Sequence, residues 1–180
     1  QHAAGKVVQR VADRQGFGVA AQGGVIQLRQ QRFDACAVVA SCLARQRRMV
    51  GGKRPRFVQG DIRDGELLSR VFGEFRIDAV MHFAGLKSVG ESVASPLDYY
   101  DNNVVGTHVL LDRMRASGVA TMVFSSSATV YGPSEPLPLR ESSGRRASSP
   151  YGRTKLMLED IIEDVHAADP RTSFARLRYF

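Results

Sequence analysis

A tyrosine and a lysine four residues apart are the side chains of this chain most suited to acid–base chemistry. Tyr151 and Lys155 follow Ser149-Pro150, a pair typical of the start of a helix. Leu158 and Ile162 stand seven residues after them, about two turns, so all four share one helix face. Burying an ammonium there costs free energy unless it has a partner, and a nearby ammonium lowers the pKa of a phenol. The alternative is that both residues lie at the edge of this face, with the lysine stem extending to water.

Three consecutive serines add hydroxyl groups to these candidates. Ser125-Ser126-Ser127 follows the apolar strand candidate Thr121–Phe124, so at least one hydroxyl is expected at the carboxyl edge of a sheet. The alternative is an ordinary turn in which serines bond their own backbone, and it applies best to Ser125 or Ser126.

Strand and helix signals alternate along the last 130 residues and indicate how these side chains are positioned. The strand candidates are Arg56–Gln59, Ile77–Phe83, Thr121–Phe124 and Phe174–Tyr179, and the helix candidates are Glu66–Phe72, a helix from Pro96 to Gly118 and one that begins at Pro150. This alternation predicts βαβ units and a parallel sheet, with Ile77–Phe83 buried on both faces. Ligands of open parallel sheets bind beyond the carboxyl ends of the strands, which directs attention to residues 60–62, 83–87, 125–131 and those after Arg178.

The composition is that of a folded domain and excludes several classes of protein. Hydrophobic residues make up 43% and charged residues 24% of the chain, which argues against disorder. No apolar run is long enough to predict a membrane span, and the first residues lack the apolar core of an export signal. Cys36 and Cys42 alone make neither a disulfide framework nor a four-ligand zinc site, and His82, His108 and His166 lack metal-ligand spacing, so no metal is predicted.

The first 50 residues differ sharply from the rest. They hold eight Lys/Arg and two Asp, a balance of +6, whereas residues 51–180 hold 17 Lys/Arg and 16 Asp/Glu, a balance of +1. Eight glutamines lie in the first part and only Gln59 in the second. We interpret the chain as two unlike pieces joined near Gly51. Because it begins with Gln1 instead of Met, we expect a fragment or a processed product.

Five phrases in the second piece carry a family resemblance. They are His82–Ser92, Tyr99–Val104, Ser125–Gly132, Ser149–Lys155 and Leu177–Phe180. A serine followed by Tyr-x-x-x-Lys resembles the extended short-chain dehydrogenase/reductase family, and the five phrases in this order resemble its UDP-glucose 4-epimerase (UDP-galactose 4-epimerase) branch. The resemblance covers about residues 51–180. It implies an α/β fold with a Rossmann-like, doubly wound parallel sheet, here incomplete, and NAD as cofactor.

The resemblance also implies roles for individual residues. Tyr151 would take the proton of the sugar 4-hydroxyl, Lys155 would hold the nicotinamide ribose and keep the phenol acidic, and Ser127 would bond the reacting oxygen. The cofactor-binding residues it implies are Asp61, Ile62, Phe83, Ala84, Gly85, Leu86, Lys87, Asn102, Ser127, Tyr151, Lys155 and Phe180. The substrate would be a UDP-hexose, held by Lys87, Ser127 and Tyr151. For Ile62, Phe83 and Phe180, plain core packing is the alternative.

The resemblance favours one reaction and leaves two alternatives open. Related sugar-nucleotide dehydratases carry an Asp-Glu pair where this chain has Ala128-Thr129, so epimerisation is favoured over loss of water. The alternatives are an epimerase or reductase of another nucleotide sugar, and a remnant that cannot hold NAD. The family also implies a cytoplasmic protein and a possible homodimer through the helices that begin at Pro96 and Pro150, with neither nucleic acid nor membrane as partner.

The expected pyrophosphate loop is missing from the first piece. A Gly-x-x-Gly-x-x-Gly loop should lie near residues 10–16, where this sequence reads Arg10–Gly16. Gly16–Ala21 is a poor approximation of that loop, and Asp34 a poor stand-in for an acidic ribose ligand. A frameshift or a mis-assembled gene model predicts this combination of expected length and altered content. The alternatives are a divergent or fused segment and a basic nucleic-acid arm. Since the chain also stops before most of the family's sugar pocket, we predict little or no activity for it as given.

Overall fold

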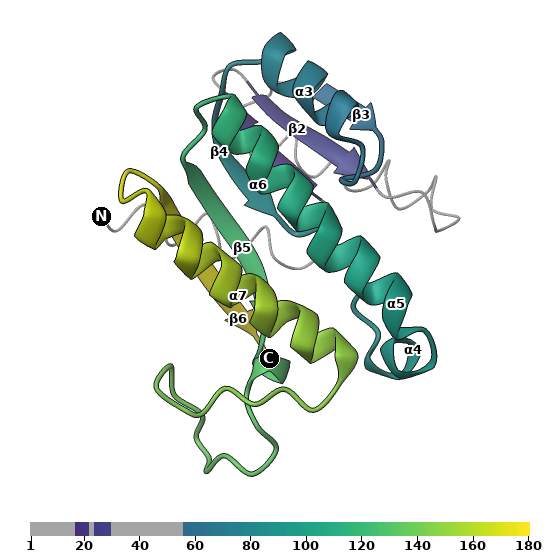
Figure 1. Cartoon of the computed structure of the whole chain (residues 1–180), viewed down its shortest axis with the longest axis vertical. Helices are drawn as coiled ribbons and strands as arrows, with labels where there is room; N and C mark the ends of the chain where they lie inside the picture. The colour runs from purple at the N-terminus through teal and green to yellow at the C-terminus, as the bar shows by residue number, and fades with distance from the viewer. Residues whose placement is uncertain (1–16, 22–23, 30–55) are drawn as a thin grey trace.

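The structure is a computed structural model that describes residues 17–21, 24–29 and 56–180 (Figure 1). The expected loop at residues 10–16, Asp34 and both cysteines lie outside the described residues. The strands are β1 (Phe17–Ala21), β2 (Gly24–Arg29), β3 (Arg56–Gln59), β4 (Ile77–His82), β5 (Thr121–Ser127) and β6 (Ser173–Tyr179). The helices are α3 (Gly65–Glu74), α4 (Val89–Ala94), α5 (Pro96–Tyr99), the π-helix η1 (Tyr100–Val105), α6 (Gly106–Ala116), the 3-10 turn η2 (Ala128–Val130) and α7 (Pro150–Ala168).

The strands form one sheet in the order β3-β2-β1-β4-β5-β6. This is the strand order of a doubly wound sheet, in which the order reverses between β1 and β4. The pairs β2–β3, β4–β5 and β5–β6 are parallel, and β1 is antiparallel to both of its neighbours, so five of the six strands run the same way. The predicted α/β fold with a largely parallel sheet is therefore confirmed.

The reversed direction of β1 departs from the predicted all-parallel sheet. Only residues 22 and 23 separate β1 from β2. Two residues can join antiparallel strands, whereas parallel neighbours need a crossover of about a dozen residues or more. Because Ala21 pairs with Ile77 and Gly18 with Met81, the carboxyl end of β1 lies at the amino end of β4. Of the segment Gly16–Ala21, considered above as a poor approximation of a phosphate loop, the described residues Phe17–Ala21 thus form a strand that runs away from the carboxyl edge.

The helices α3, α6 and α7 lie on the same face of the sheet (Figure 1). The core between these helices and the sheet consists mainly of Leu68, Val71, Leu110, Met114, Met122, Phe124, Leu158 and Ile162. In β4, Val80 and His82 are buried, whereas Ala79 and Met81 are only half-buried. The prediction that this strand is buried on both faces was wrong, because the described helices cover only one of them. None of the helices in the described ranges is long and apolar enough to span a membrane.

The helix predicted from Pro96 to Gly118 is divided by a π-helical segment. It runs through α5, η1 and α6 and ends at Ala116, two residues before Gly118, whose positive φ of 71° suits a position just after a helix C-terminus. A π turn holds one residue more than an α turn and is common at functional sites. Here it contains Asn102 and Asn103, both of which are buried. The short helix α4 precedes α5, begins at the Ser88 cap and was not predicted.

Candidate active site

The helix α7 presents the tyrosine and the lysine, as its first residues predict. The Ser149 hydroxyl accepts a hydrogen bond from the backbone N–H of Gly152 (3.1 Å), and Pro150 occupies the first turn. The buried face of α7 carries Tyr151, Thr154, Lys155, Leu158, Glu159 and Ile162. The predicted face shared by Tyr151, Lys155, Leu158 and Ile162 is therefore confirmed, and Thr154 and Glu159 lie on it as well.

Lys155 is the buried cation of this site, with only 5% of its surface exposed. Its ammonium donates a hydrogen bond to the backbone carbonyl of Ser125 (2.8 Å) and lies 4.9 Å from the centre of the Phe124 ring. Burial disfavours the charged form and lowers the pKa of Lys155 to about 8. The alternative of a lysine stem that extends to water is thereby excluded.

Tyr151 is buried beside the lysine and against a second tyrosine. Its ring meets that of Tyr99 edge to face, with the centroids 6.4 Å apart. Burial raises the pKa of Tyr151, and a hydrogen bond with the Ser127 hydroxyl opposes that rise. The expected lowering of this pKa by the lysine is not found. The reason is geometric, since the Lys155 ammonium lies 6.0 Å from the ring centroid and is bonded to the Ser125 carbonyl.

The three serines at the end of β5 have three different contacts. The backbone carbonyl of Ser125 accepts a hydrogen bond from the Lys155 ammonium. The hydroxyl of Ser126 donates a hydrogen bond to the Glu159 carboxylate (2.5 Å). The hydroxyl of Ser127 caps η2, because it accepts hydrogen bonds from the N–H (3.2 Å) and the hydroxyl (3.0 Å) of Thr129. Of the three serines, only Ser127 affects the pKa of Tyr151, and its predicted bond to the reacting oxygen stays a prediction.

The loop after β4 passes close to the lysine. A Cβ added to Gly85 would lie 3.1 Å from Oδ1 of Asn103 and 3.6 Å from Nζ of Lys155, and its φ of +152° is rarely adopted by other residues. The Asn103 side chain binds both backbone groups of Leu86, since it accepts a hydrogen bond from the N–H (2.8 Å) and donates one to the carbonyl (3.0 Å). Ala84 packs against the core, whereas the Lys87 side chain is exposed.

Two buried amides come from the π-helical segment. Asn102 donates to Oδ1 of Asn103 (2.9 Å), and Asn103 also donates to the hydroxyl of Thr154 on α7 (3.1 Å). The predicted residue Asn102 thus contacts the loop through its neighbour. Asn103 and Thr154 were missed. Two adjacent asparagines inside an otherwise amphipathic helix were the available signal, since buried amides need partners.

His82 lies beneath this loop and is fully buried. Its Nε2 lies 2.7 Å from the hydroxyl of Thr107, which itself donates to the carbonyl of Asn103. Burial and, second, the Lys155 charge lower the pKa of His82 to about 3, so the ring is neutral at pH 7. A neutral, buried imidazole with this partner supports packing and excludes a role as a cation.

The predicted adenine contacts, Asp61 and Ile62, follow the edge strand β3, which three strands separate from β5 and its contact with Lys155. Arg63 donates to both carboxylate oxygens of Asp61 (3.0 and 2.6 Å) and also pairs with Asp101, and these contacts hold the pKa of Asp61 below its usual value. Ile62 is buried against Gly106, where an added Cβ would come within 2.6 Å of its side chain. Core packing, the alternative for Ile62, is therefore at least part of its role.

Phe180 and a surface groove stand apart from the tyrosine and lysine. Phe180 is 91% exposed and follows Tyr179, which pairs with Ser127 at the end of β5. A groove of about 450 Å³ lies between the start of α3 and α6, lined by residues 63–66 and by His108, Val109, Asp112 and Arg113. It contains none of the predicted site residues. Within the described ranges, no group of three or more His, Cys, Asp or Glu side chains is placed to hold a metal ion.

Comparison with known proteins identifies the family. A family model described as GDP-mannose 4,6 dehydratase matches residues 26–177, so the match begins inside the first 50 residues, ahead of the boundary expected near Gly51. A UDP-glucose 4-epimerase of Neisseria meningitidis serogroup B is 52% identical over 148 residues, which are 82% of this chain and 43% of that protein. The chain thus spans less than half the length of this curated relative.

Solved structures give the same result. UDP-glucose 4-epimerase from Bifidobacterium longum, in complex with NAD+ and UDP, is 50% identical with a TM-score of 0.73, over 77% of this chain and 41% of that one. The enzyme from Stenotrophomonas maltophila, with bound NAD and formylated UDP-arabinopyranose, is 45% identical with a TM-score of 0.76, over 88% and 46%. The chain therefore belongs to the GDP-mannose 4,6 dehydratase family, among the extended short-chain dehydrogenase/reductases, and is similar there to UDP-glucose 4-epimerases.

Proposed function

We propose that this chain is part of an NAD-dependent UDP-glucose/UDP-galactose 4-epimerase in which Tyr151 is the base. The observation that carries the proposal is the buried group at the carboxyl end of β5. There the Tyr151 phenol bonds the Ser127 hydroxyl, and the Lys155 ammonium lies beside the ring. Strong similarity to UDP-glucose 4-epimerases of two bacteria supports the same assignment.

The carboxyl edge around β4 and β5 fits the nicotinamide end of NAD. Gly85 leaves a space that a Cβ would fill, within 3.6 Å of the Lys155 ammonium, and the loop around it is fixed by Asn103. Phe83, Ala84, Leu86 and Asn102 complete the residues we propose to hold this end. Asp61 and Ile62, after β3, are proposed to contact the adenine. This arrangement spans the reversal of strand order between β1 and β4, where dinucleotides bind in doubly wound sheets.

The chain's own residues account for the proton chemistry. NAD, when bound, supplies a reversible hydride acceptor. Tyr151 takes the proton of the sugar 4-hydroxyl as the 4-keto sugar forms and returns it to the oxygen when C4 has been inverted. Ser127 donates to the reacting oxygen, and Lys155 holds the ribose hydroxyls. Lys87, exposed at the end of the loop, is proposed to lie near the pyrophosphate side of NAD and to contact the UDP-hexose.

Burial of the site disfavours the phenolate that the base requires, and Ser127 opposes this effect. A base that works near pH 7 needs a pKa close to 7, whereas burial raises that of Tyr151 above 10. Lys155, with a pKa of about 8, remains charged at pH 7 and can bind the ribose hydroxyls as a cation, although at 6.0 Å from the ring centroid it does not lower the pKa of Tyr151. The Ser127 hydroxyl favours the phenolate through its hydrogen bond.

Substitution of the tyrosine tests the proposal in an intact parent enzyme. Tyr151→Phe should abolish conversion of UDP-galactose to UDP-glucose while NAD remains bound, as measured by product analysis and by release of NAD after acid denaturation. Full activity in this variant would show that the proton acceptor lies elsewhere. Conversion of a different nucleotide sugar by the unsubstituted parent would favour the alternative epimerase or reductase.

We also propose that the chain as given has little or no activity, because its first 50 residues do not supply the pyrophosphate loop. The reversed β1 is consistent with this, since its carboxyl end lies at the opposite edge of the sheet from Lys155. Epimerase turnover by this polypeptide would contradict the proposal. Translating all three forward frames of the coding DNA for residues 1–50 tests the frameshift. An apolar strand followed by Gly-x-x-Gly-x-x-Gly in another frame is the expected result.

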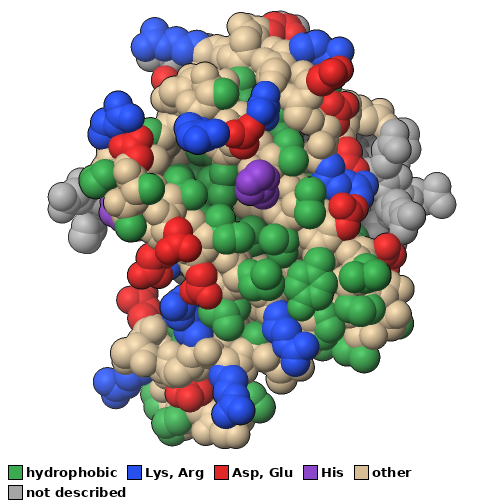
Figure 2. Space-filling view, viewed as in Figure 1, with side chains coloured by type: hydrophobic (Ala, Val, Ile, Leu, Met, Phe, Trp, Pro, Cys, Tyr) green, Lys and Arg blue, Asp and Glu red, His purple; other side chains and the backbone are tan. Residues whose placement is uncertain are grey.

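A second copy of the chain is proposed to cover the exposed apolar residues of the helices. Val93 and Leu97, on α4 and α5, are 65% and 80% exposed, and Met157 on α7 is 43% exposed. Figure 2 shows hydrophobic side chains gathered on this face over α5 and α7. Sedimentation equilibrium should therefore give a dimer, and Leu97→Glu should give a monomer. A cytoplasmic location stays a prediction from the family resemblance.

A further inference from the structure

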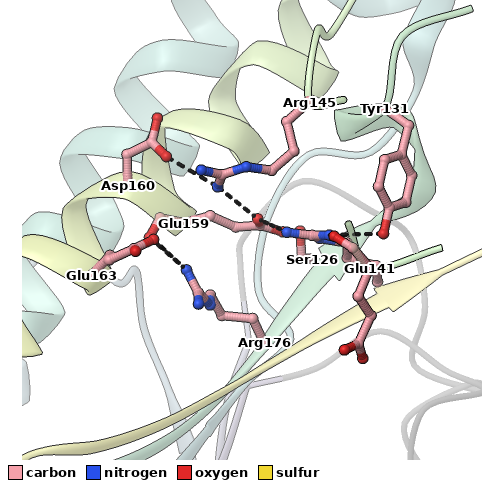
Figure 3. A network of polar contacts seen from close by, with 9 residues as sticks. Ser126, Tyr131, Glu141, Arg145, Glu159, Asp160, Glu163 and Arg176 are labelled. Atoms are coloured by element: carbon pink, nitrogen blue, oxygen red, sulfur yellow. Dashed lines mark hydrogen bonds and ion pairs between the residues drawn. The ribbon is translucent and has the colours of Figure 1, made fainter. Parts of the chain in front are cut away.

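Glu159 is a carboxylate with no exposed surface, and neither the sequence motifs nor the proposed chemistry uses it. It lies on α7 four residues after Lys155, and its side chain faces the sheet. Arg178 on β6 donates to both of its oxygens (2.9 and 2.7 Å), Arg145 from the loop before α7 donates to one of them (3.2 Å), and Ser126 on β5 donates to the other (2.5 Å). Figure 3 shows these groups converging on the one carboxylate.

The network joins four parts of the chain around the end of β5. Ser126 and Arg178 are register partners on neighbouring parallel strands, so their side chains reach the same carboxylate from one face of the sheet. Arg178 continues the network, because it donates to the hydroxyl of Tyr131 (2.7 Å) and to the backbone carbonyl of Glu141 (3.3 Å). The ion pair between Arg178 and Glu159 therefore also holds the loop between β5 and α7.

The buried ion pair of Glu159 and Arg178 is a poor way to stabilise the fold, because burying its charges costs free energy. Burial by itself would raise the pKa of Glu159, but hydrogen bonds from Arg178 and Ser126 outweigh it and hold the pKa below its usual value. Buried ion pairs are often no more stabilising than apolar residues of the same volume, and their best-attested use is to fix one arrangement. The arrangement fixed here is the position of Ser126 relative to α7.

We propose that Glu159 is a positioning residue that fixes the carboxyl end of β5 against α7 and thereby sets the geometry of the active site. The two neighbours of Ser126 in the chain make the contacts that matter. The carbonyl of Ser125 receives the Lys155 ammonium, and the hydroxyl of Ser127 meets the tyrosine. The functional part of this inference rests on the proposed function, whereas the geometric part does not.

The titration of Lys155 reports this geometry without cofactor or substrate. The chain has four lysines, so ¹³Cε-lysine spectra contain few signals, and Lys155→Met assigns the one of interest. The titratable groups that face Lys155 are His82 from β4 and Tyr151 from its own helix. His82, with a pKa of about 3, stays neutral across the titration, and the pKa of Tyr151 is raised. Movement of the Lys155 signal with pH therefore reports the lysine itself.

Glu159→Gln distinguishes positioning from a direct effect of charge. If Glu159 positions the end of β5, its loss lets water reach the ammonium, and relief of burial, the cause of the lowered pKa, outweighs the weakened bond to the Ser125 carbonyl, so the pKa of Lys155 rises by about 1 toward the usual 10.5. If only its negative charge acts, removing that charge lowers the pKa of Lys155. The sign of the change therefore separates the two explanations. A loss of global stability alone does not change the pKa of Lys155, because the measured signal comes from the folded state.

Ser126→Ala and Glu163→Gln complete the test. Ser126→Ala keeps every ion pair and removes only the link to β5, so it should raise the pKa of Lys155 even if Glu159→Gln does not fold. Glu163→Gln removes an exposed ion pair with Arg176 on the same helix (2.9 Å) and should leave the titration unchanged. A Lys155 pKa that is unchanged or lowered in Ser126→Ala and in every folded Glu159→Gln sample would overturn the positioning role. Failure of an intact parent to hold NAD or epimerise UDP-galactose would instead overturn the proposed function.

Discussion

Replacement of Lys155 by methionine should make the folded chain more stable at neutral pH. The ammonium is buried in the folded state, where its pKa is about 8, and exposed in the unfolded state, where the usual value of 10.5 applies. Methionine has a similar length, carries no charge and suits a position beside the Phe124 ring. The substitution therefore removes a charged group whose burial in the folded state costs free energy.

The size and sign of the effect follow from the two pKa values. A difference of about 2.5 between the states corresponds to about 3 kcal/mol of free energy, at about 1.36 kcal/mol for each pKa unit. Between pH 8 and 10.5 the unfolded chain holds a proton that the folded chain has lost, so stability rises with pH over this window. Below pH 8 both states are protonated and the full cost remains. Loss of the bond to the Ser125 carbonyl offsets about 1 kcal/mol, which leaves a net gain of about 2 kcal/mol at pH 7.

Urea unfolding of the two proteins at several pH values measures this effect. The free energy of unfolding of the variant minus that of wild type should be about 2 kcal/mol at pH 7 and should fall steadily to pH 10.5. Lys87→Met is the matched control, because the Lys87 side chain is exposed and its removal should leave the pH dependence as it was. A difference between Lys155→Met and wild type that does not change with pH would refute the reasoning, since it would mean that the lysine is not buried as a cation.

Three other predictions concern the surroundings of the lysine. Gly85→Ala should destabilise the chain by about 1–3 kcal/mol, because it adds a tight contact with Asn103 to an unfavourable φ, and thermal unfolding measures the loss. Gly118→Ala has the unfavourable φ but open space around it and should cost less, so an equal loss would contradict the close packing at Gly85. Asn103→Ala should cost about 1–3 kcal/mol, since it leaves buried groups of Leu86 unpaired, and hydrogen exchange at the Leu86 N–H should become faster. Ser127→Ala should raise the pKa of Tyr151 further in a phenolate absorbance titration, and a lowered pKa would contradict the hydrogen bond.

The elements of residues 56–180 were predictable because their local signals agree with their packing. Ser149-Pro150 begins α7 through a cap and a first-turn proline, and the stripe of Leu158 and Ile162 faces the core. The positions of strands β4, β5 and β6 follow from short apolar runs. The direction of β1 was not predictable in this way. It depends on a two-residue separation from β2, and neither strand was predicted although both contain apolar residues.

The site was predictable as a set of residues more than as a set of contacts. The sequence places Tyr151 and Lys155 on one face, and the structure confirms their burial. The sequence does not indicate that the Lys155 ammonium would bond the backbone carbonyl of Ser125. The two residues are 30 apart in the chain, and they meet only because α7 packs against the end of β5. Glu159 was missed for a similar reason. An acidic residue beside Leu158 resembles a solvated charge until Arg178, from the next strand, is placed opposite it.

Burial has opposite consequences for the two residues proposed to share the proton chemistry. It lowers the pKa of Lys155 and raises that of Tyr151, so it favours the neutral lysine and the neutral phenol over the pair of ions. The base needs the ionic pair, and the site must recover it through directed contacts. The Ser125 carbonyl is one such contact for the ammonium, and the Ser127 hydroxyl is one for the phenolate. Both come from the last three residues of β5, whose position is held by Ser126 and Glu159. A buried carboxylate without access to substrate is thus proposed to affect the proton affinities of two residues that it does not bond.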